Sequence, residues 1–207
     1  MQRIPLISTI AFLAFAPAAF AIPDADGNIA SIPAPDLSDD AAMKARLNYN
    51  VGYETWQKTA ELEHAGATLS GTRARENQEA VRAGFARARE NFRTAVGADS
   101  NMKEGWNMLG YTSRRLGDYE ESLKAYDKAL SLAPDYPEAI EYRAELFLLT
   151  GRLAQAKEAY ATLLKSSPSY AGVLKTSMKD FLKSKQMLPA AVTPAERDAF
   201  ASWVAKL

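Results

Sequence analysis

The sequence lacks the residue types that many specialised sites require. Its 207 residues contain no cysteine and one histidine, His64. Without cysteine the fold has no disulfide, and a lipid-modified cysteine of the bacterial lipoprotein kind is excluded. One imidazole without a second histidine gives little support for a metal site or for catalysis. We therefore expect neither a metal nor a cofactor.

Net charge and catalytic motifs are missing as well. The chain has 25 basic and 25 acidic residues, a balance that gives no reason to expect nucleic acid or an anionic membrane as partner. There is no glycine-rich phosphate loop, no HExxH motif and no serine elbow. Glu141 and Glu145 lie one helical turn apart, which is more typical of a solvated or groove-facing surface than of an acid–base pair. The sequence therefore predicts a protein that is not an enzyme.

The N-terminal residues have the pattern of a secretory signal peptide. Arg3 precedes a mostly apolar run over residues 4–16, and Ala19, Phe20 and Ala21 give the small-x-small pattern of a cleavage site. We predict a signal peptide over residues 1–21, cleaved after Ala21. The run is too short to span a bilayer, so no integral membrane anchor is expected. A buried N-terminal helix is the alternative, although Pro17 and Pro23 would interrupt it.

The central part of the chain repeats itself every 34 residues. The matched pairs are Gly117 and Gly151, Tyr126 and Tyr160, Leu130 and Leu164, and Pro134 and Pro168. Such a period is typical of arrays of helical hairpins. The first copy contains, in order, Trp106, Leu109, Gly110, Gly117, Tyr119, Tyr126, Ala129, Leu130 and Pro134, and this pattern resembles the tetratricopeptide repeat (TPR). The resemblance implies an all-α fold, an α-solenoid of about three hairpins closed by C-terminal capping helices.

These patterns divide the chain into segments. Residues 22–38 are rich in Pro, Asp, Ala and Ser and are predicted to be a flexible lead-in. The TPR domain is predicted over residues 39–187, with hairpins at about 39–98, 103–133 and 137–167 and an extra helix at 170–186. A capping helix is expected over residues 193–207, although its apolar stripe could instead bind a partner or a membrane surface.

The first hairpin is predicted to be longer than the others. Gly52 and Ala88 correspond to a glycine and an alanine that lie 12 residues apart in a standard repeat, but here they are 36 residues apart. We expect the excess to extend both helices, with the turn near Gly66 to Gly71. The second of these helices has a local surplus of arginine. We interpret it as a solvated helix face, or alternatively as a docking surface for an acidic partner or lipid headgroups. The arginines are Arg73, Arg75, Arg82, Arg87, Arg89 and Arg93.

The TPR resemblance also implies a concave groove lined by the first helix of each hairpin. The residues at the groove-facing positions are Tyr49, Tyr53 and Trp56, then Asn107, Tyr111 and Arg114, and then Glu138, Glu141, Glu145 and Leu148. Such a groove would be aromatic at one end and acidic at the other, and would suit an extended or helical peptide. The alternative is that Tyr53 and Trp56 only pack the first hairpin. The third hairpin has glutamates where a carboxylate clamp needs basic residues, so a C-terminal carboxylate ligand is not expected.

Together these features predict a bacterial exported TPR protein of the periplasm. We expect a non-enzymatic adaptor or scaffold that binds another protein or peptide through its groove. A structural or homo-oligomerising module and an accessory subunit of an envelope enzyme complex are the alternatives.

Overall fold

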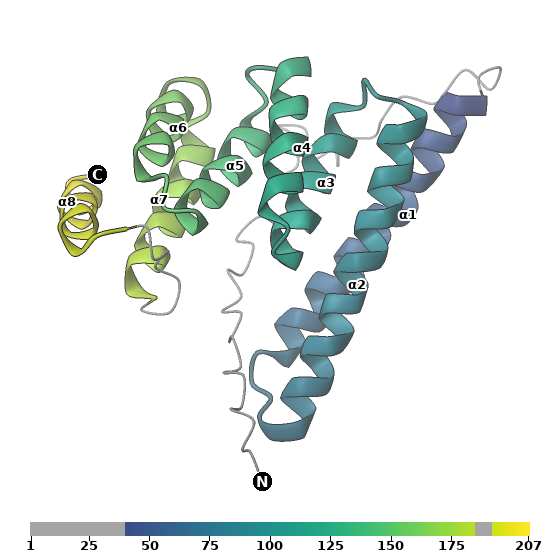
Figure 1. Ribbon diagram of the computed structural model, residues 1–207, viewed down its shortest axis with the longest axis horizontal. Helices are drawn as coiled ribbons and strands as arrows, with labels where there is room; N and C mark the ends of the chain where they lie inside the picture. The colour runs from purple at the N-terminus through teal and green to yellow at the C-terminus, as the bar shows by residue number, and fades with distance from the viewer. Residues whose placement is uncertain (1–39, 185–191) are drawn as a thin grey trace, which may run out of the picture.

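The computed structural model describes residues 40–184 and 192–207, and these residues form an all-α fold. The helices follow one another as hairpins that stack side by side along the molecule (Figure 1). The predicted fold class, an all-α array of helical hairpins, is confirmed. The predicted signal peptide over residues 1–21 and lead-in over 22–38 lie outside the described residues.

The helix bounds give three hairpins followed by two further helices. Helices α1 (Asp40–Gly66) and α2 (Gly71–Ala98) form the first hairpin, and the turn between them lies where Gly66 and Gly71 predict it. The second hairpin is α3 (Lys103–Leu116) and α4 (Tyr119–Leu132), and the third is α5 (Pro137–Leu149) and α6 (Leu153–Ser166). Helix α7 (Pro168–Lys183) begins at the proline, two residues earlier than predicted, and α8 (Pro194–Val204) ends the described chain.

Two glycines at matched positions end the first helices of the second and third hairpins. Gly117 has a φ of 85° and Gly151 a φ of 76°, in the left-handed region that glycine adopts without steric cost. After each glycine the chain turns back in the same way: the N–H of Asp118 donates to the carbonyl of Ser113, and that of Arg152 to the carbonyl of Phe147. The 34-residue spacing therefore reflects one turn geometry used twice.

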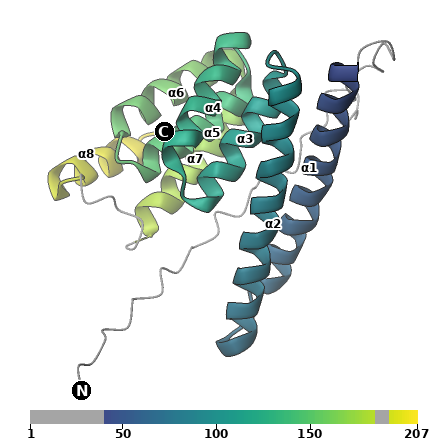
Figure 2. The same cartoon turned by 45° about the vertical axis from the view of Figure 1, so that its right-hand side comes forward.

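The elongated hairpin keeps the helix contact of the standard one. A Cβ on Gly110 would lie 2.7 Å from the ring of Tyr126, and a Cβ on Gly52 would lie 2.9 Å from the ring of Phe92. The first pair is 16 residues apart and the second is 40, which reproduces the 24-residue excess deduced from the sequence. The additional residues lengthen both helices, so the α1/α2 hairpin extends past the rest of the array (Figures 1 and 2).

Ion pairs attach the long hairpin to the second one. Arg93 of α2 donates through Nε and Nη2 to Oε1 of Glu121 on α4, at 3.2 and 2.6 Å. On the α1 side, Arg115 of α3 pairs with Glu63 and lies over the ring of Phe85, 4.5 Å from its centroid. Arg89 lies 3.6 Å from the same Glu121. Two members of the arginine surplus thus act within the fold.

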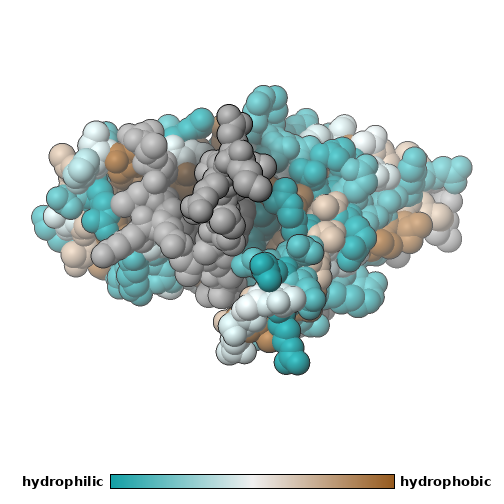
Figure 3. All heavy atoms as spheres, turned by 60° about the horizontal axis from the view of Figure 1, so that its bottom comes forward, coloured by the Kyte–Doolittle hydropathy of each residue, from teal (hydrophilic) through white to brown (hydrophobic). Residues whose placement is uncertain are grey.

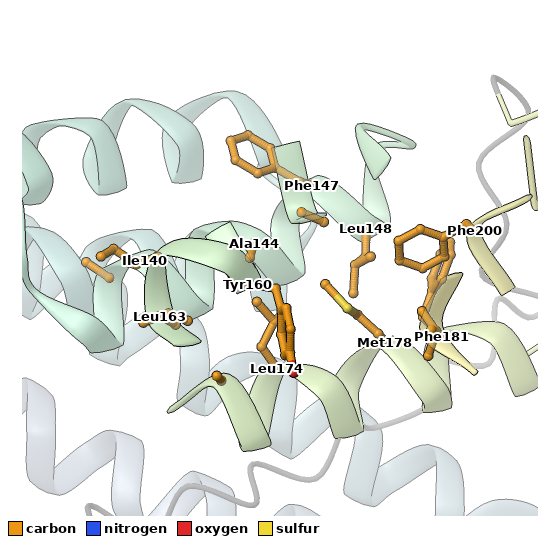
Figure 4. Packing of buried hydrophobic residues seen from close by; sticks show 14 of the residues in the cluster. Ile140, Ala144, Phe147, Leu148, Tyr160, Leu163, Leu174, Met178, Phe181 and Phe200 are labelled. Carbon is orange, nitrogen blue, oxygen red and sulfur yellow. The ribbon is translucent and has the colours of Figure 1, made fainter. Parts of the chain in front are cut away.

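The C-terminal half has a continuous apolar core that α8 covers. Leu148, Met178, Phe181 and Phe200 are almost fully buried, and their side chains converge in Figure 4. Thr193 begins α8 with a capping box: its side chain accepts from the N–H of Glu196, whose carboxylate accepts from the N–H of Thr193. The apolar stripe of α8 therefore packs against the preceding helices, as a capping helix does in a repeat array.

Candidate binding wall on the first helices

Helices α3, α5 and α7 are in register along the face predicted to bind a ligand. Arg114 of α3 forms an ion pair with Glu145 on α5, with 2.7 Å between Nη2 and Oε2. The other oxygen of Glu145 accepts from the hydroxyl of Ser177 on α7, also at 2.7 Å. This row, Arg114–Glu145–Ser177, links three consecutive first helices. We call the face that bears it the first-helix wall.

A second row lies two turns nearer the helix N-termini. Tyr170 of α7 donates through its hydroxyl to Oε1 of Glu138 on α5 at 2.5 Å. Burial, followed by this hydrogen bond, raises the pKa of the Tyr170 hydroxyl. The register that pairs residue 114 with 145 places Asn107 level with Glu138. The row is therefore Asn107–Glu138–Tyr170, and all three side chains are polar.

Aromatic rings line the wall toward the first hairpin. Tyr53 of α1 lies 6.0 Å from Tyr49 and 5.0 Å from Trp56 between ring centroids, and Trp56 meets Tyr111 of α3 edge-on at 5.9 Å. Tyr111 in turn lies 5.1 Å from Tyr142 of α5. Trp56 and Tyr111 are buried, whereas Tyr49 and Tyr53 are half-buried. The accessible aromatic surface of the wall is thus that of Tyr49 and Tyr53.

Glu141 lies between the two rows and is the unusual group of the wall. Its side chain is 1% exposed, yet its Oε1 has no hydrogen-bond partner. Burial, followed by the charge of Glu145, raises the pKa of the Glu141 carboxyl well above its usual range. A buried acceptor without a donor costs free energy, and such groups are rare in native structures. Asn107 is similar: it is 3% exposed, and its Oδ1 also lacks a partner.

Three predicted groove residues, Trp56, Tyr111 and Leu148, belong to the hydrophobic core. Leu148 is 1% exposed and points toward Met178, Phe181 and Phe200 (Figure 4). Its position on α5 faces α7 and the covering helix α8, so it is not available to a ligand. This corrects the sequence-based assignment, which could not separate the two faces because both follow the same helical period.

The sequence interpretation also missed residues that complete the rows. Tyr170 and Ser177 follow Glu138 and Glu145 by 32 residues each, close to the repeat length. That spacing could have extended the wall onto α7, but the fainter repeat after Pro168 gave no reason to do so. Tyr142, which carries the ring contacts from α3 to α5, had no distinguishing signal.

The surface around the array is largely polar. Figure 3 shows mostly hydrophilic residues, with small separate hydrophobic patches, on the described surface that faces the viewer. In the described parts of the chain no helix is long and apolar enough to cross a membrane. Over residues 40–184 and 192–207, no group of three or more His, Cys, Asp and Glu side chains could hold a metal ion.

Comparison with known proteins agrees with the repeat pattern. Residues 103–136, which span α3, α4 and the following turn, match the family model of the tetratricopeptide repeat. The curated protein "TPR repeat-containing thioredoxin TTL4" of Arabidopsis thaliana is 33% identical over 78 residues. The match covers 38% of this chain and 11% of that relative. The chain thus spans only a small part of the relative's length.

Proposed function

Because this helical array contains a tetratricopeptide repeat, we propose that the protein is a non-enzymatic adaptor that binds a protein or peptide through its first-helix wall. The observation that supports this function best is the pair of polar rows. Arg114–Glu145–Ser177 runs across three consecutive first helices, and Tyr170–Glu138 links two of them, with Asn107 two turns before Arg114 on α3. Rows of ordered donors and acceptors on a rigid scaffold favour an extended ligand that crosses the helices, because little ordering is needed when it binds.

Two half-buried tyrosines of the wall, one on α1 and one on α7, provide a test. We would replace Tyr53 and Tyr170, which are half-buried, with alanine and use both proteins as bait in an extract of the source cells. The matched control is Tyr119→Ala, because Tyr119 is also half-buried but lies on the second helix α4. A protein retained by wild type and by the control, and lost from the double variant, would establish binding through the wall. Equal retention by all three would refute it.

We propose further that the adaptor acts in the periplasm after removal of residues 1–21. Arg3, the apolar run over residues 4–16 and the small residues Ala19 and Ala21 support this location. The test is to express the full chain in a bacterium, separate periplasm from cytoplasm and determine the N-terminus by mass spectrometry. A periplasmic protein that begins at Ile22 is expected. A cytoplasmic protein that retains residues 1–21 would refute the proposal.

One observation favours self-association as a second function. Met43, Leu47 and Val51 form an exposed apolar stripe at i, i+4 and i+8 on the outer side of α1, with Leu47 62% exposed. The end helix of a repeat array needs a polar outer face or a partner. Sedimentation velocity of Leu47→Glu should show a smaller species than wild type. The control is Leu164→Glu on α6, since Leu164 is 53% exposed and should not alter the association state.

A further inference from the structure

The first-helix wall has buried polar atoms that its own residues do not satisfy, and two of them are acceptors on adjacent helices. Glu145 accepts from Arg114 and Ser177, and Glu138 accepts from Tyr170. Glu141 lies between these two carboxylates on α5, and its Oε1 has no donor, although the side chain is 1% exposed. The one arginine of the wall, Arg114, already pairs with Glu145. Arg114 also acts on Glu141, but its charge is shared with Glu145, so an ionised Glu141 has no positive partner of its own among the described residues.

A second unsatisfied acceptor lies on the neighbouring helix. Asn107 of α3 is 3% exposed, and its Oδ1 has no partner. The register of α3 and α5 places it level with Glu138, one turn from Glu141. Two buried acceptors on adjacent helices suit a ligand that donates several hydrogen bonds at once. A lysine ammonium has three donors and an arginine guanidinium has five, whereas neither carries an acceptor.

We propose that the first-helix wall binds a basic side chain, lysine or arginine, of a peptide or protein partner, with Glu141 as its anion and Asn107 as an additional acceptor. This inference rests on the proposed peptide-binding function and assigns the chemistry of its ligand. Tyr49 and Tyr53 extend the site on the α1 side, where aromatic faces stabilise the stem and charge of such a side chain.

The chain's own N-terminal residues do not have the required chemistry. Residues 22–39 contain four aspartates and no lysine or arginine. Their charge has the same sign as that of Glu138, Glu141 and Glu145, so electrostatic complementarity disfavours them as the ligand of this site. The occupant that we propose is therefore a separate, basic chain.

The test compares two fluorescein-labelled decapeptide pools that differ only in a central arginine or citrulline. Citrulline keeps the shape of arginine but has no charge. We expect fluorescence anisotropy to show the arginine pool binding wild type about ten-fold more tightly than the citrulline pool. Glu141→Gln should bring the two affinities together. Glu158→Gln, on the exposed face of α6, should keep the ten-fold difference. Circular dichroism would verify that both variants are folded.

Several results would overturn the proposal. Equal binding of both pools to wild type, or no binding of either, would remove the requirement for a basic side chain. A difference that persists in Glu141→Gln would place the anion elsewhere. Preference for a matched glutamate pool would make Arg114 the anchor instead. The two proposals fail separately. If the Tyr53 and Tyr170 variant loses a captured partner that Glu141→Gln retains, the adaptor function stands and the basic-ligand proposal fails. If wild type and the Tyr53 and Tyr170 variant capture the same proteins, the adaptor function through the wall fails.

Discussion

The close approach of Gly110 to Tyr126 allows a quantitative prediction about how helix packing within a hairpin contributes to stability. A Cβ at Gly110 would lie 2.7 Å from two carbons of the Tyr126 ring, and Tyr126 is fully buried. The ring cannot move aside without displacing the neighbouring core, so Gly110→Ala forces overpacking. Such overpacking typically costs about 1–3 kcal/mol.

A second effect has the opposite sign. Alanine favours a helix interior over glycine by about 1 kcal/mol, so Gly110→Ala also gains helix propensity. Gly172 of α7 isolates that gain, because a Cβ there would meet nothing within 4 Å. We therefore expect Gly172→Ala to raise the free energy of unfolding by about 1 kcal/mol and Gly110→Ala to lower or barely change it. The difference between the two variants is the packing cost, about 1–3 kcal/mol.

Urea unfolding followed by circular dichroism would measure this difference. At about 2–4 °C per kcal/mol for a chain of this size, the two variants should also differ in Tm by roughly 2–12 °C. Tyr126→Leu in the Gly110→Ala background should recover part of the loss, because leucine removes the ring atoms that clash. Equal changes at Gly110 and Gly172 would refute the close helix approach on which the hairpin geometry rests.

Three further predictions concern ion pairs and caps. Arg114→Ala should lower the free energy of unfolding by about 3–5 kcal/mol, because it leaves the carboxylate of Glu145 buried beside Glu141. Adding Glu145→Gln to Arg114→Ala should recover part of this loss in urea unfolding. If the effects of the two substitutions simply add, the two side chains do not interact. The pKa of Glu141 is raised in the folded protein, where Glu138, Glu145 and Arg114 are the charged groups that act on its carboxyl. Because the unfolded chain ionises this carboxyl more readily, the free energy of unfolding falls as pH rises from the usual carboxyl range through the pKa of the folded state. Glu141→Gln should therefore raise Tm at neutral pH and leave it unchanged at acid pH, and a constant difference at all pH values would contradict this. Thr193→Ala removes the capping box of α8, so amide exchange should accelerate in α8 but not in α3.

The fold class could be predicted because its signals are local and repeated. Gly117 and Gly151 each need a left-handed backbone, and Gly110 needs a close helix neighbour, so residue type and spacing encode the turn and the packing directly. The same logic identified the long first hairpin, since Gly52 keeps its helix contact across 24 additional residues. Residue type and spacing therefore predict the helix packing even in a hairpin of irregular length.

The binding wall was only partly predictable, because burial depends on neighbouring helices and not on spacing within one helix. Leu148 and Glu145 are both on α5 at the repeat's groove positions, but Leu148 is in the core and Glu145 joins a polar row. The pairing of Arg114 with Glu145 depends on the register between helices that are 31 residues apart along the chain. The sequence contains both charges without showing that they meet.

The free-energy cost of burying the Glu141 carboxyl allows a binding role to be distinguished from a structural one. Glutamine has nearly the same shape and would remove the buried charge, so a purely structural position would be more stable with glutamine and lose nothing. Arg114 acts on the carboxyl but is already paired with Glu145, so Glu141 has no counter-charge of its own among the described residues. If Glu141 holds a basic ligand, Glu141→Gln must increase stability and weaken binding together. If it only supports the fold, the same change alters stability and leaves ligand affinity where it was.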